Sequence, residues 1–512
     1  MDNLFTFHPM PPERVSPGAW RRFAAGLAAF LLLMLATTRA ERGGDFIEYG
    51  AMAVALSQHG TPDVRAADAE LARQYSPEAG IAAMFERLRD GIRRGDAVPL
   101  PGFQRASGGT YSIHFFAYPA LAALPLRALH AAGADPFKAF QIVNYAALAA
   151  LGLALLRLTA SARRAACAFA LVLAGGGILY ANWCSPEILS AALLLSGLVL
   201  STTGRPLAGG LLAGVAAMHN PSIVCFAVCA PLLAFADPAG WHGTARPAWR
   251  RLAAGSLLQV ALAALPFVFF QWRFGTPSLI GKGYTDFHLV SGARLVSYYF
   301  DLNQGMVVGL AAIPLLLLAG TRARGARTAA ALAVTAVFML GLALPTLVMT
   351  NWNAGANGML RYALWGAAPL LYLVFARWRG LARWPVALLA LVLVLQAGLM
   401  AHARRYTPKE FSPLARAVLD HAPGLYNPDP DVFYKRAVHT DLGQDPQRVA
   451  RWPEQGPVRK AMFQAGNPDV DQVLCGPGQR LAPATASRDA GGGWRYVDGP
   501  VPCVAATNLA HQ

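Results

Sequence analysis

The stretch RLAAGSLLQVALAALPFVFFQ, residues 251–271, is charged only at its first residue and is otherwise apolar apart from one serine and two glutamines. With a rise of about 1.5 Å per residue, a helix of this length crosses the roughly 30 Å of hydrocarbon in a bilayer. Comparable apolar blocks occupy residues 22–40 and 385–400. The sequence therefore predicts an all-α polytopic membrane protein.

The composition of the whole chain agrees with this prediction. Of its 512 residues, 55% are hydrophobic and only 14% are charged, which is outside the usual range for a soluble protein. The formal net charge is +16, and the arginines gather in short clusters between apolar blocks. Such clusters are typical of cytoplasmic loops that face anionic lipid, so we expect membrane lipids as partners and no nucleic acid.

Basic clusters also orient the candidate spans. Arg14, Arg21 and Arg22 precede the first span and predict a cytoplasmic amino terminus; a secretory signal peptide ending near Ala40 is the alternative. Later clusters predict an external carboxyl terminus, which requires an odd number of spans, and the proline-containing segment 111–129 can be re-entrant instead. Twelve segments are candidate spans, and one further crossing outside them is an alternative, so we expect eleven to thirteen spans. The candidates are residues 22–40, 111–129, 136–156, 164–180, 187–200, 206–218, 221–236, 251–271, 306–318, 328–349, 361–375 and 385–400.

Polar stretches define the domain organisation. Residues 1–400 are expected to form a transmembrane module, with a long first external loop over residues 41–110. Residues 401–512 lose the apolar pattern and gain proline and glycine, which predicts a small external domain. Cys475 and Cys503 are the only cysteines of this tail, so they fit one disulfide in an oxidising compartment. The other four cysteines lie in or beside apolar segments and are interpreted as structural.

Candidate catalytic residues follow the first span directly. On a helix over residues 44–56, Asp45, Glu48, Tyr49 and Met52 lie on one side, with the two carboxylates about one turn apart at the membrane boundary. A carboxylate in this position can act as a base. The alternative is an acidic residue that the helix dipole favours near the N-terminus. Glu48 can orient an acceptor, hold a divalent cation or cap the helix.

This segment resembles the first-loop motif of the GT-C glycosyltransferases, a family that includes the protein mannosyltransferases and the bacterial aminoarabinose transferases. Further resemblances follow in the family's order within roughly residues 20–400. They are residues 112–119 with His114, 185–187 with Glu187, 219–221 with His219, 300–306, and 353–362 with Arg361 and Tyr362. Two positions depart from the family pattern: Phe46 stands where many members have a second acidic residue, and His219 stands where a lysine is usual.

The resemblance implies a GT-C-like helical bundle in the bacterial inner membrane, with a periplasmic carboxyl terminus. It implies an inverting transfer of a sugar from a polyprenyl-phosphate donor to a lipid or glycan acceptor on the periplasmic face. Such a transfer needs a base near the acceptor hydroxyl and cationic groups near the departing phosphate. We expect Asp45 to be the base and Glu48 to be the second catalytic carboxylate.

Several residues are candidates for binding the substrate and its phosphate. Arg361 offers a guanidinium that can bind phosphate oxygens in a fork, although an interfacial anchor is its alternative role. Lys282 lies in a glycine-flanked loop, where a solvated lysine is the alternative. The candidates are Arg361, Tyr362, Lys282, His219, His114 and Glu187.

Other functions remain open on the sequence alone. A ligase, polymerase or flippase of lipid-linked glycans would share the long outer loop, and a non-catalytic assembly protein could retain the fold. A secondary transporter is a further alternative, but the chain shows no internal repeat of the kind found in many transporters. The sequence also lacks a Gly-x-x-x-x-Gly-Lys motif, a His-Glu-x-x-His motif and a strand-bracketed Gly-x-Gly-x-x-Gly motif, which argues against a nucleotide-driven pump or a nucleotide-sugar enzyme.

Overall fold

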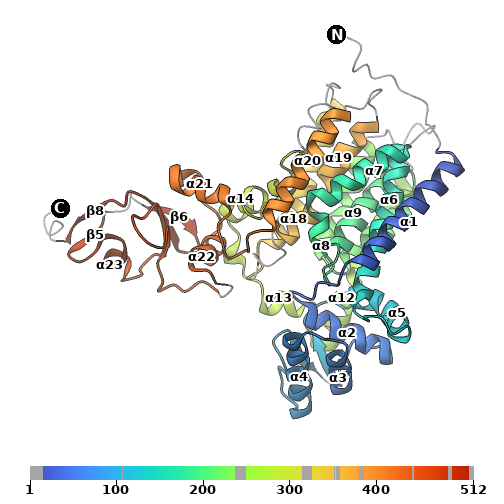
Figure 1. Cartoon of the computed structure of the whole chain (residues 1–512), viewed down its shortest axis with the longest axis horizontal. Coiled ribbons are helices and arrows are strands. Elements are labelled where there is room, and N and C mark those ends of the chain that lie inside the picture. The colour runs from blue at the N-terminus through green and yellow to red at the C-terminus, as the bar shows by residue number, and fades with distance from the viewer. Residues whose placement is uncertain are drawn as a thin grey trace, which may run out of the picture. The chain divides into compact units, whose positions relative to one another are not determined.

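The computed structural model describes residues 15–106, 108–236, 249–313, 326–350, 352, 358–379, 386–440, 443–482 and 487–506. The chain is mainly helical and forms two compact units (Figure 1). The first unit comprises Met1–Thr285, Ala312–Leu342 and Leu364–Gln396. The second comprises Asp286–Ala311, Ala343–Ala363 and Ala397–Gln512.

The first unit begins with α1 (Pro17–Thr37), an apolar helix of 21 residues. Ser16 caps this helix by accepting a hydrogen bond from the Ala19 amide, and Pro17 occupies the first turn, where no amide donor is needed. In the described part of the chain, α1 is one of five helices that are long and apolar enough to cross a bilayer, the others being Lys138–Thr159, Ala162–Tyr180, Trp249–Phe274 and Ala326–Thr346. The protein is therefore a helical membrane protein.

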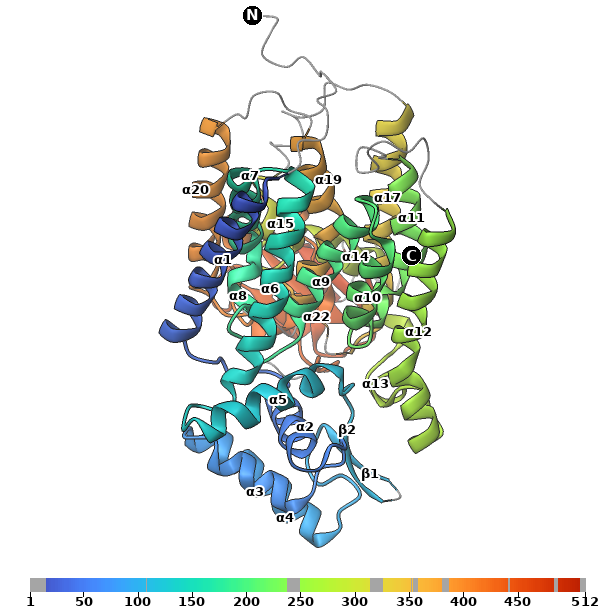
Figure 2. The same cartoon turned by 90° about the vertical axis from the view of Figure 1, so that its right-hand side faces the viewer.

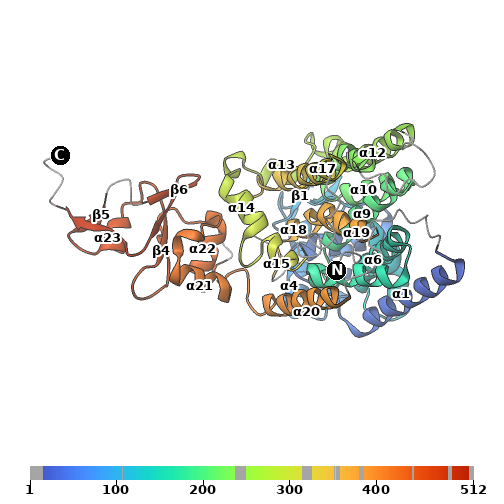
Figure 3. The same cartoon turned by 90° about the horizontal axis from the view of Figure 1, so that it is seen from above.

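Close backbone packing holds the bundle of the first unit together. Helix α10 (Pro206–Ala217) lies between α9 (Glu187–Thr202) and α12 (Trp249–Phe274), and α6 (Lys138–Thr159) lies on the other side of α9 (Figure 3). A Cβ added at Gly210 would lie 2.0 Å from the Gly255 carbonyl oxygen, so only glycine fits at this crossing. Small residues at such crossings allow two helices to approach closely in lipid.

Several further helices are short or lie next to residues that the structure does not describe. They are α7 (Ala162–Val172), η1 (Leu173–Gly177), α8 (Ile178–Tyr180), η2 (Pro221–Cys225), α11 (Phe226–Ala236), α13 (Leu279–Gly283), α17 (Ala326–Ala343), η5 (Leu344–Thr346), α18 (Arg361–Gly366), α19 (Ala368–Arg379) and α20 (Val386–Ala403). Residues 314–318 of the expected span 306–318, and residues 353–357 of the expected outer motif 353–362, lie outside the described residues.

The expected external loop folds into a compact group of short elements at one end of the long helices (Figure 2). Rings of Phe46, Phe85 and Phe137 meet edge to face or stacked at its centre, and they bury the apolar side of the first short helix. The expected span 111–129 starts on a strand, and only its later part is helical. The elements are α2 (Phe46–His59), α3 (Ala66–Gln74), α4 (Ala79–Arg94), the antiparallel pair β1 (Phe103–Ala106) and β2 (Gly109–Ser112), and α5 (Ala117–Ala131).

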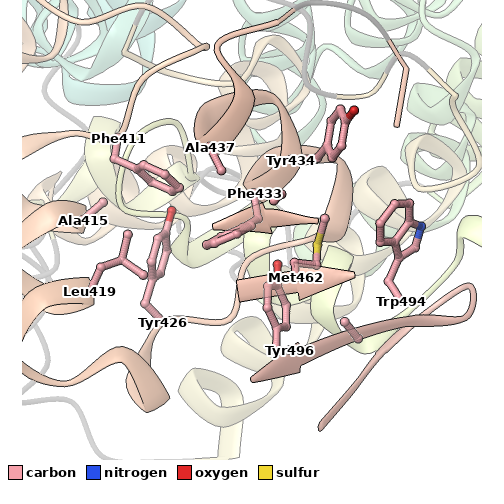
Figure 4. Packing of buried hydrophobic residues seen from close by; sticks show 12 residues of the cluster. Phe411, Ala415, Leu419, Tyr426, Phe433, Tyr434, Ala437, Met462, Trp494 and Tyr496 are labelled. Atoms are coloured by element: carbon pink, nitrogen blue, oxygen red, sulfur yellow. The ribbon is translucent and has the colours of Figure 1, made fainter. Parts of the chain in front are cut away.

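The second unit contains the carboxyl-terminal part of the chain. Its four-stranded antiparallel sheet has the order β3-β4-β7-β6, and a smaller sheet pairs β5 with β8. Phe433, Tyr496 and Trp494 belong to the core between this sheet and the helices (Figure 4). Cys475 and Cys503 form a disulfide. The elements are α21 (Pro413–His421), η6 (Pro423–Leu425), α22 (Pro430–Val438), β3 (Ala450–Trp452), β4 (Lys460–Gln464), α23 (Val470–Cys475), β5 (Gln479–Leu481), β6 (Ser487–Gly491), β7 (Trp494–Asp498) and β8 (Cys503–Ala505).

A segment from well before residue 400 belongs to this same unit. It contains η4 (Phe287–Leu289), α14 (Gly292–Phe300) and α15 (Met306–Leu310). Asp301, between α14 and α15, is buried and forms two hydrogen bonds of 2.8 Å with the Arg436 guanidinium, while the Tyr426 hydroxyl donates a third at 2.7 Å. Burial raises the pKa of Asp301, but the charge and hydrogen bonds of Arg436 outweigh it and leave that pKa lowered. The compact unit is thus larger than the expected domain 401–512.

This buried ion pair predicts a strong effect of removing one partner. Arg436→Met leaves the Asp301 charge buried without its cation, which should cost about 3–5 kcal/mol of unfolding free energy. Thermal unfolding of the purified protein in detergent measures the loss. The double variant Asp301→Leu/Arg436→Met should recover a large part of it, because no uncompensated charge remains. Arg488→Met, which removes a half-exposed arginine paired with Asp498, is the control, and an equal loss in the control would contradict the prediction.

Candidate active site

The linker between α1 and α2 fixes the position of Asp45. The Glu41 amide donates a hydrogen bond of 2.9 Å to the Asn182 carbonyl, which ties the linker to the segment before α9. Gly44 then adopts φ +60°, and a Cβ added there would lie 2.8 Å from the Trp183 ring. Helix α2 begins directly afterwards, with Asp45 at its N-cap position. The Asp45 carboxylate is therefore held at the first turn of α2, with 26% of the side chain exposed.

Two histidines and one tyrosine extend from Asp45. His114, on the segment between β2 and α5, brings Nε2 to 3.8 Å from Asp45 Oδ1. Its other ring nitrogen, Nδ1, lies 3.4 Å from the Tyr49 hydroxyl. The same hydroxyl lies 3.0 Å from Nε2 of His219. We call these four residues the Asp45 cluster, in the spatial order Asp45, His114, Tyr49, His219.

The donors and acceptors of this cluster can be matched. A tyrosine hydroxyl donates one hydrogen bond and can accept another, and a neutral imidazole has one donor and one acceptor nitrogen. Tyr49 can therefore donate to His219 Nε2 while it accepts from an N–H at His114 Nδ1. Protonation of His114 then adds an N–H at Nε2, beside the Asp45 carboxylate, and creates an ion pair. The arrangement can carry a proton from one end to the other.

Aromatic packing positions the central tyrosine. The Tyr118 ring lies 5.8 Å from that of Tyr49 and 6.1 Å from that of His219, and the Tyr118 hydroxyl donates to Asn144 Oδ1 at 3.2 Å. The sequence placed Tyr49 on the Asp45 side of the helix and Tyr118 within the segment 112–119, but it gave neither a role, and it gave no sign of Asn144. The four-residue spacing from Asp45 to Tyr49 was the available signal for Tyr49.

Glu48 lies in a different environment from Asp45, although it is less than one turn away. Burial and, next, the charge of Asp45 raise the pKa of Glu48 to about 8. The carboxyl group packs against Gly102, where an added Cβ would lie 2.1 Å from Glu48 Oε1. Gly102 has φ +91°, which also favours glycine. At pH 7 Glu48 is mostly protonated, so it is suited to donate a hydrogen bond rather than to act as a base.

Helix α9 supports the turn that carries His219. Glu187 begins this helix and is buried, and the Ser185 hydroxyl donates to its carboxylate. One turn further, the Ser190 hydroxyl accepts a hydrogen bond of 2.7 Å from Asn220 Nδ2. Because Asn220 adjoins His219, this bond fixes the end of α10 against α9. Glu187 thus belongs to the buried framework of the site, and its expected role in substrate binding stays a prediction.

Three other candidate residues lie outside the Asp45 cluster. Lys282, in α13, is exposed and makes no hydrogen bond or ion pair with any residue that the structure describes. Arg361 and Tyr362, at the start of α18, belong to the second unit. There the Arg361 guanidinium lies 5.0 Å from the centre of the Tyr362 ring and donates to the Tyr362 hydroxyl at 3.1 Å. Their roles in phosphate binding stay predictions.

Within the described ranges, no group of three or more His, Cys, Asp or Glu residues is arranged to hold a metal ion. No protein-family model, no curated protein and no solved structure matches the chain. The residues and geometry of the chain itself therefore carry the functional proposal. Its central feature is a carboxylate at a membrane boundary that is followed by two imidazoles and a phenol.

The raised pKa of Glu48 predicts how stability depends on pH. The folded protein holds the Glu48 proton more tightly than the unfolded chain does, because in the unfolded chain the pKa of Glu48 is near its ordinary value of 4.5. Glu48 therefore costs stability progressively as the pH rises from about 4.5 to about 8, and Glu48→Gln removes this cost. The melting temperature of the variant, relative to the native protein, should rise across this window and then level off. The control is Glu86→Gln, on the exposed side of α4; a Glu48→Gln difference that is as flat as the control would show the prediction to be wrong.

Proposed function

We propose that the chain is an integral-membrane glycosyltransferase of the GT-C type, which moves a sugar from a polyprenyl phosphate to an acceptor hydroxyl. The observation that carries this proposal is the position of the Asp45 carboxylate. It lies at the first turn of the helix that follows the α1 span, and His114 lies 3.8 Å away. Such a carboxylate can reach an acceptor whose sugar donor is anchored in the lipid.

Asp45 is the proposed base. The acceptor hydroxyl oxygen forms a bond to the anomeric carbon while the bond from that carbon to the phosphate oxygen breaks, and the phosphate leaves with the electron pair. Asp45 takes the hydroxyl proton during this displacement. A single displacement from the side opposite the phosphate inverts the anomeric centre, as in inverting glycosidases with a carboxylate base.

The other acidic and basic candidates take complementary roles. Glu48, protonated at neutral pH, donates a hydrogen bond that orients the acceptor or the sugar. Arg361, beside Tyr362, binds phosphate oxygens as a bidentate cation, and Lys282 is a second cation for the same group. These assignments to the phosphate rest on residue chemistry and on the family resemblance.

His114, Tyr49 and His219 offer a route for the proton that Asp45 has accepted. The proton passes from Asp45 to His114 Nε2, the Nδ1 proton of His114 passes to the Tyr49 oxygen, and the Tyr49 proton passes to His219 Nε2. The distances of 3.4 and 3.0 Å at Tyr49 support the second and third steps. The first step requires Asp45 and His114 to approach more closely than their separation of 3.8 Å, or a water molecule between them. The histidine at position 219, where the family usually has lysine, supplies an acceptor nitrogen that a protonated lysine lacks.

The proposed setting is the bacterial inner membrane, with a GT-C-like bundle of eleven to thirteen spans. Basic clusters between the apolar segments support a cytoplasmic amino terminus and a periplasmic carboxyl terminus. The Cys475–Cys503 disulfide supports the second assignment, because disulfides persist in oxidising compartments such as the periplasm. The acceptor is proposed to be a lipid or a glycan on that face.

Replacement of Asp45 tests the proposal. Asp45→Asn keeps the size of the side chain but removes the base, so transfer should fall by roughly 10²–10⁴-fold. The measurement is the transfer of label from a radiolabelled polyprenyl-phosphate sugar to membrane-extract acceptors by the purified protein. Asp90→Asn, at an exposed carboxylate on α4, is the control and should keep full activity. Equal transfer by Asp45→Asn would remove Asp45 from this role, and movement of the donor across sealed vesicles without a covalent product would support a transporter or flippase.

Tyr49→Phe tests the proton route. The ring and its packing remain, but the hydroxyl that connects the two histidines is lost. We expect kcat to fall about ten-fold, as loss of one catalytic hydrogen bond to a charged group implies, with KM nearly unchanged. The pH profile of kcat should also lose its dependence on His219. Tyr145→Phe removes an equally buried hydroxyl elsewhere in the unit and serves as the control; an effect of similar size there would show that only folding is disturbed.

A further inference from the structure

A hollow of about 840 Å³ lies in the first unit, apart from the Asp45 cluster. Three chain segments line it: residues 36–42 at the end of α1, residues 74–78 between α3 and α4, and residues 130–138 between α5 and α6. None of the four residues of the Asp45 cluster is among its lining residues. We call it the α1–α6 pocket.

The ends of two membrane spans place this pocket at the lipid boundary. Helix α1 ends at Thr37 and α6 begins at Lys138, and both residues line the pocket. Lys138 Nζ donates a hydrogen bond of 2.7 Å to the Leu35 carbonyl at the end of α1, so the two span ends lie at the same level. In a bilayer, that level is the headgroup region, where the apolar part of a span ends.

The charges of the pocket leave a cationic surplus. Arg42, with 5% of its side chain exposed, forms ion pairs with both Glu78 and Asp135, so these three residues together carry one net negative charge and the whole lining carries one net positive charge. Arg39 and Lys138 are the other two charged residues of the lining, and both are cations. Arg39 is exposed and forms no hydrogen bond or ion pair with the part of the chain that the structure describes. The pocket therefore offers two cationic groups for an anion.

Apolar side chains lie on α1 immediately before the pocket. Leu32 and Leu33 are 64% and 62% exposed, and they precede Arg39 by about two turns of helix. Such side chains are in contact with acyl chains when α1 crosses a bilayer. A ligand that joins an anionic group to hydrocarbon chains therefore fits both the cationic pocket and the apolar side chains of α1. A free anion would contact only the cationic pocket.

We propose that the α1–α6 pocket binds an anionic phospholipid. Its phosphodiester lies between Arg39 and Lys138, and its acyl chains follow the exposed side of α1. The fixed ion pairs of Arg42 with Glu78 and Asp135 hold the two loops that form the rest of the wall. The argument for this binding does not rest on the proposed sugar transfer, because no residue of the Asp45 cluster lines the pocket.

The test measures lipid binding by the full-length purified protein in detergent. Native mass spectrometry compares binding of phosphatidylglycerol with binding of phosphatidylcholine. The native protein should prefer phosphatidylglycerol, and Arg39→Gln should reduce its affinity about five-fold, the effect of one cation near a lipid surface. The matched control is Arg22→Gln, which removes an equally exposed arginine from the opposite end of α1 and should leave the affinity unchanged.

Other outcomes would overturn this proposal. Equal losses in Arg39→Gln and Arg22→Gln would indicate only a general attraction between a basic protein and anionic lipid. Displacement of phosphatidylglycerol by millimolar inorganic phosphate would indicate an anion site that needs no acyl chain. A short-chain polyprenyl phosphate that binds at Arg39 where phosphatidylglycerol does not would indicate a donor site instead. Because Arg39 is exposed, its replacement should not impair folding, and circular dichroism of the variant verifies this.

Discussion

The length of the apolar helix α1 is the constraint on which the candidate site depends. The bilayer sets the depth at which α1 ends, and only residues 38–44 separate that end from Asp45. A backbone hydrogen bond from Glu41 to the segment before α9 further restricts the positions that this linker can adopt. The Asp45 carboxylate is therefore fixed near the lipid boundary by the hydrophobic effect and by local geometry together. Position, rather than the presence of an acidic residue, is what suits Asp45 to the proposed lipid-linked substrate.

The two acidic residues at the start of α2, Asp45 and Glu48, lie in different surroundings. Asp45 is partly exposed at the N-cap of α2 beside an imidazole, whereas Glu48 packs against Gly102 and has its pKa raised to about 8. Two carboxyl groups with different environments can serve as base and as hydrogen-bond donor in one site. In the GT-C family that this segment resembles, many members have a second acidic residue where this chain has Phe46; under the proposed roles, that residue is not needed as a second base. Phe46 instead packs against Phe85 and Phe137 and anchors the start of α2.

The parts of the structure that depend on local pattern could be predicted from the sequence. Apolar blocks predicted membrane helices, and the spacing of Asp45, Glu48 and Tyr49 predicted the helix that the structure shows as α2. Contacts between distant segments could not be predicted, because periodicity carries no information on helix rotation. The contacts of Tyr49 with His114 and His219 are of this kind. So is the buried pair of Asp301 and Arg436, which adds a segment from before residue 401 to the second unit. The pKa of Glu48 likewise depends on burial that no local motif encodes.

One linker connects the α1–α6 pocket with the Asp45 cluster. Arg42 lines the pocket and lies 5.9 Å from the centre of the Phe46 ring, and Phe46 directly follows Asp45. A phospholipid bound at Arg39 would add an anionic contact on the pocket side of this linker. A ligand shifts a conformational equilibrium only by its difference in affinity for the two states. The lipid would therefore move the proposed base only to the extent that it binds one position of this linker more tightly than another.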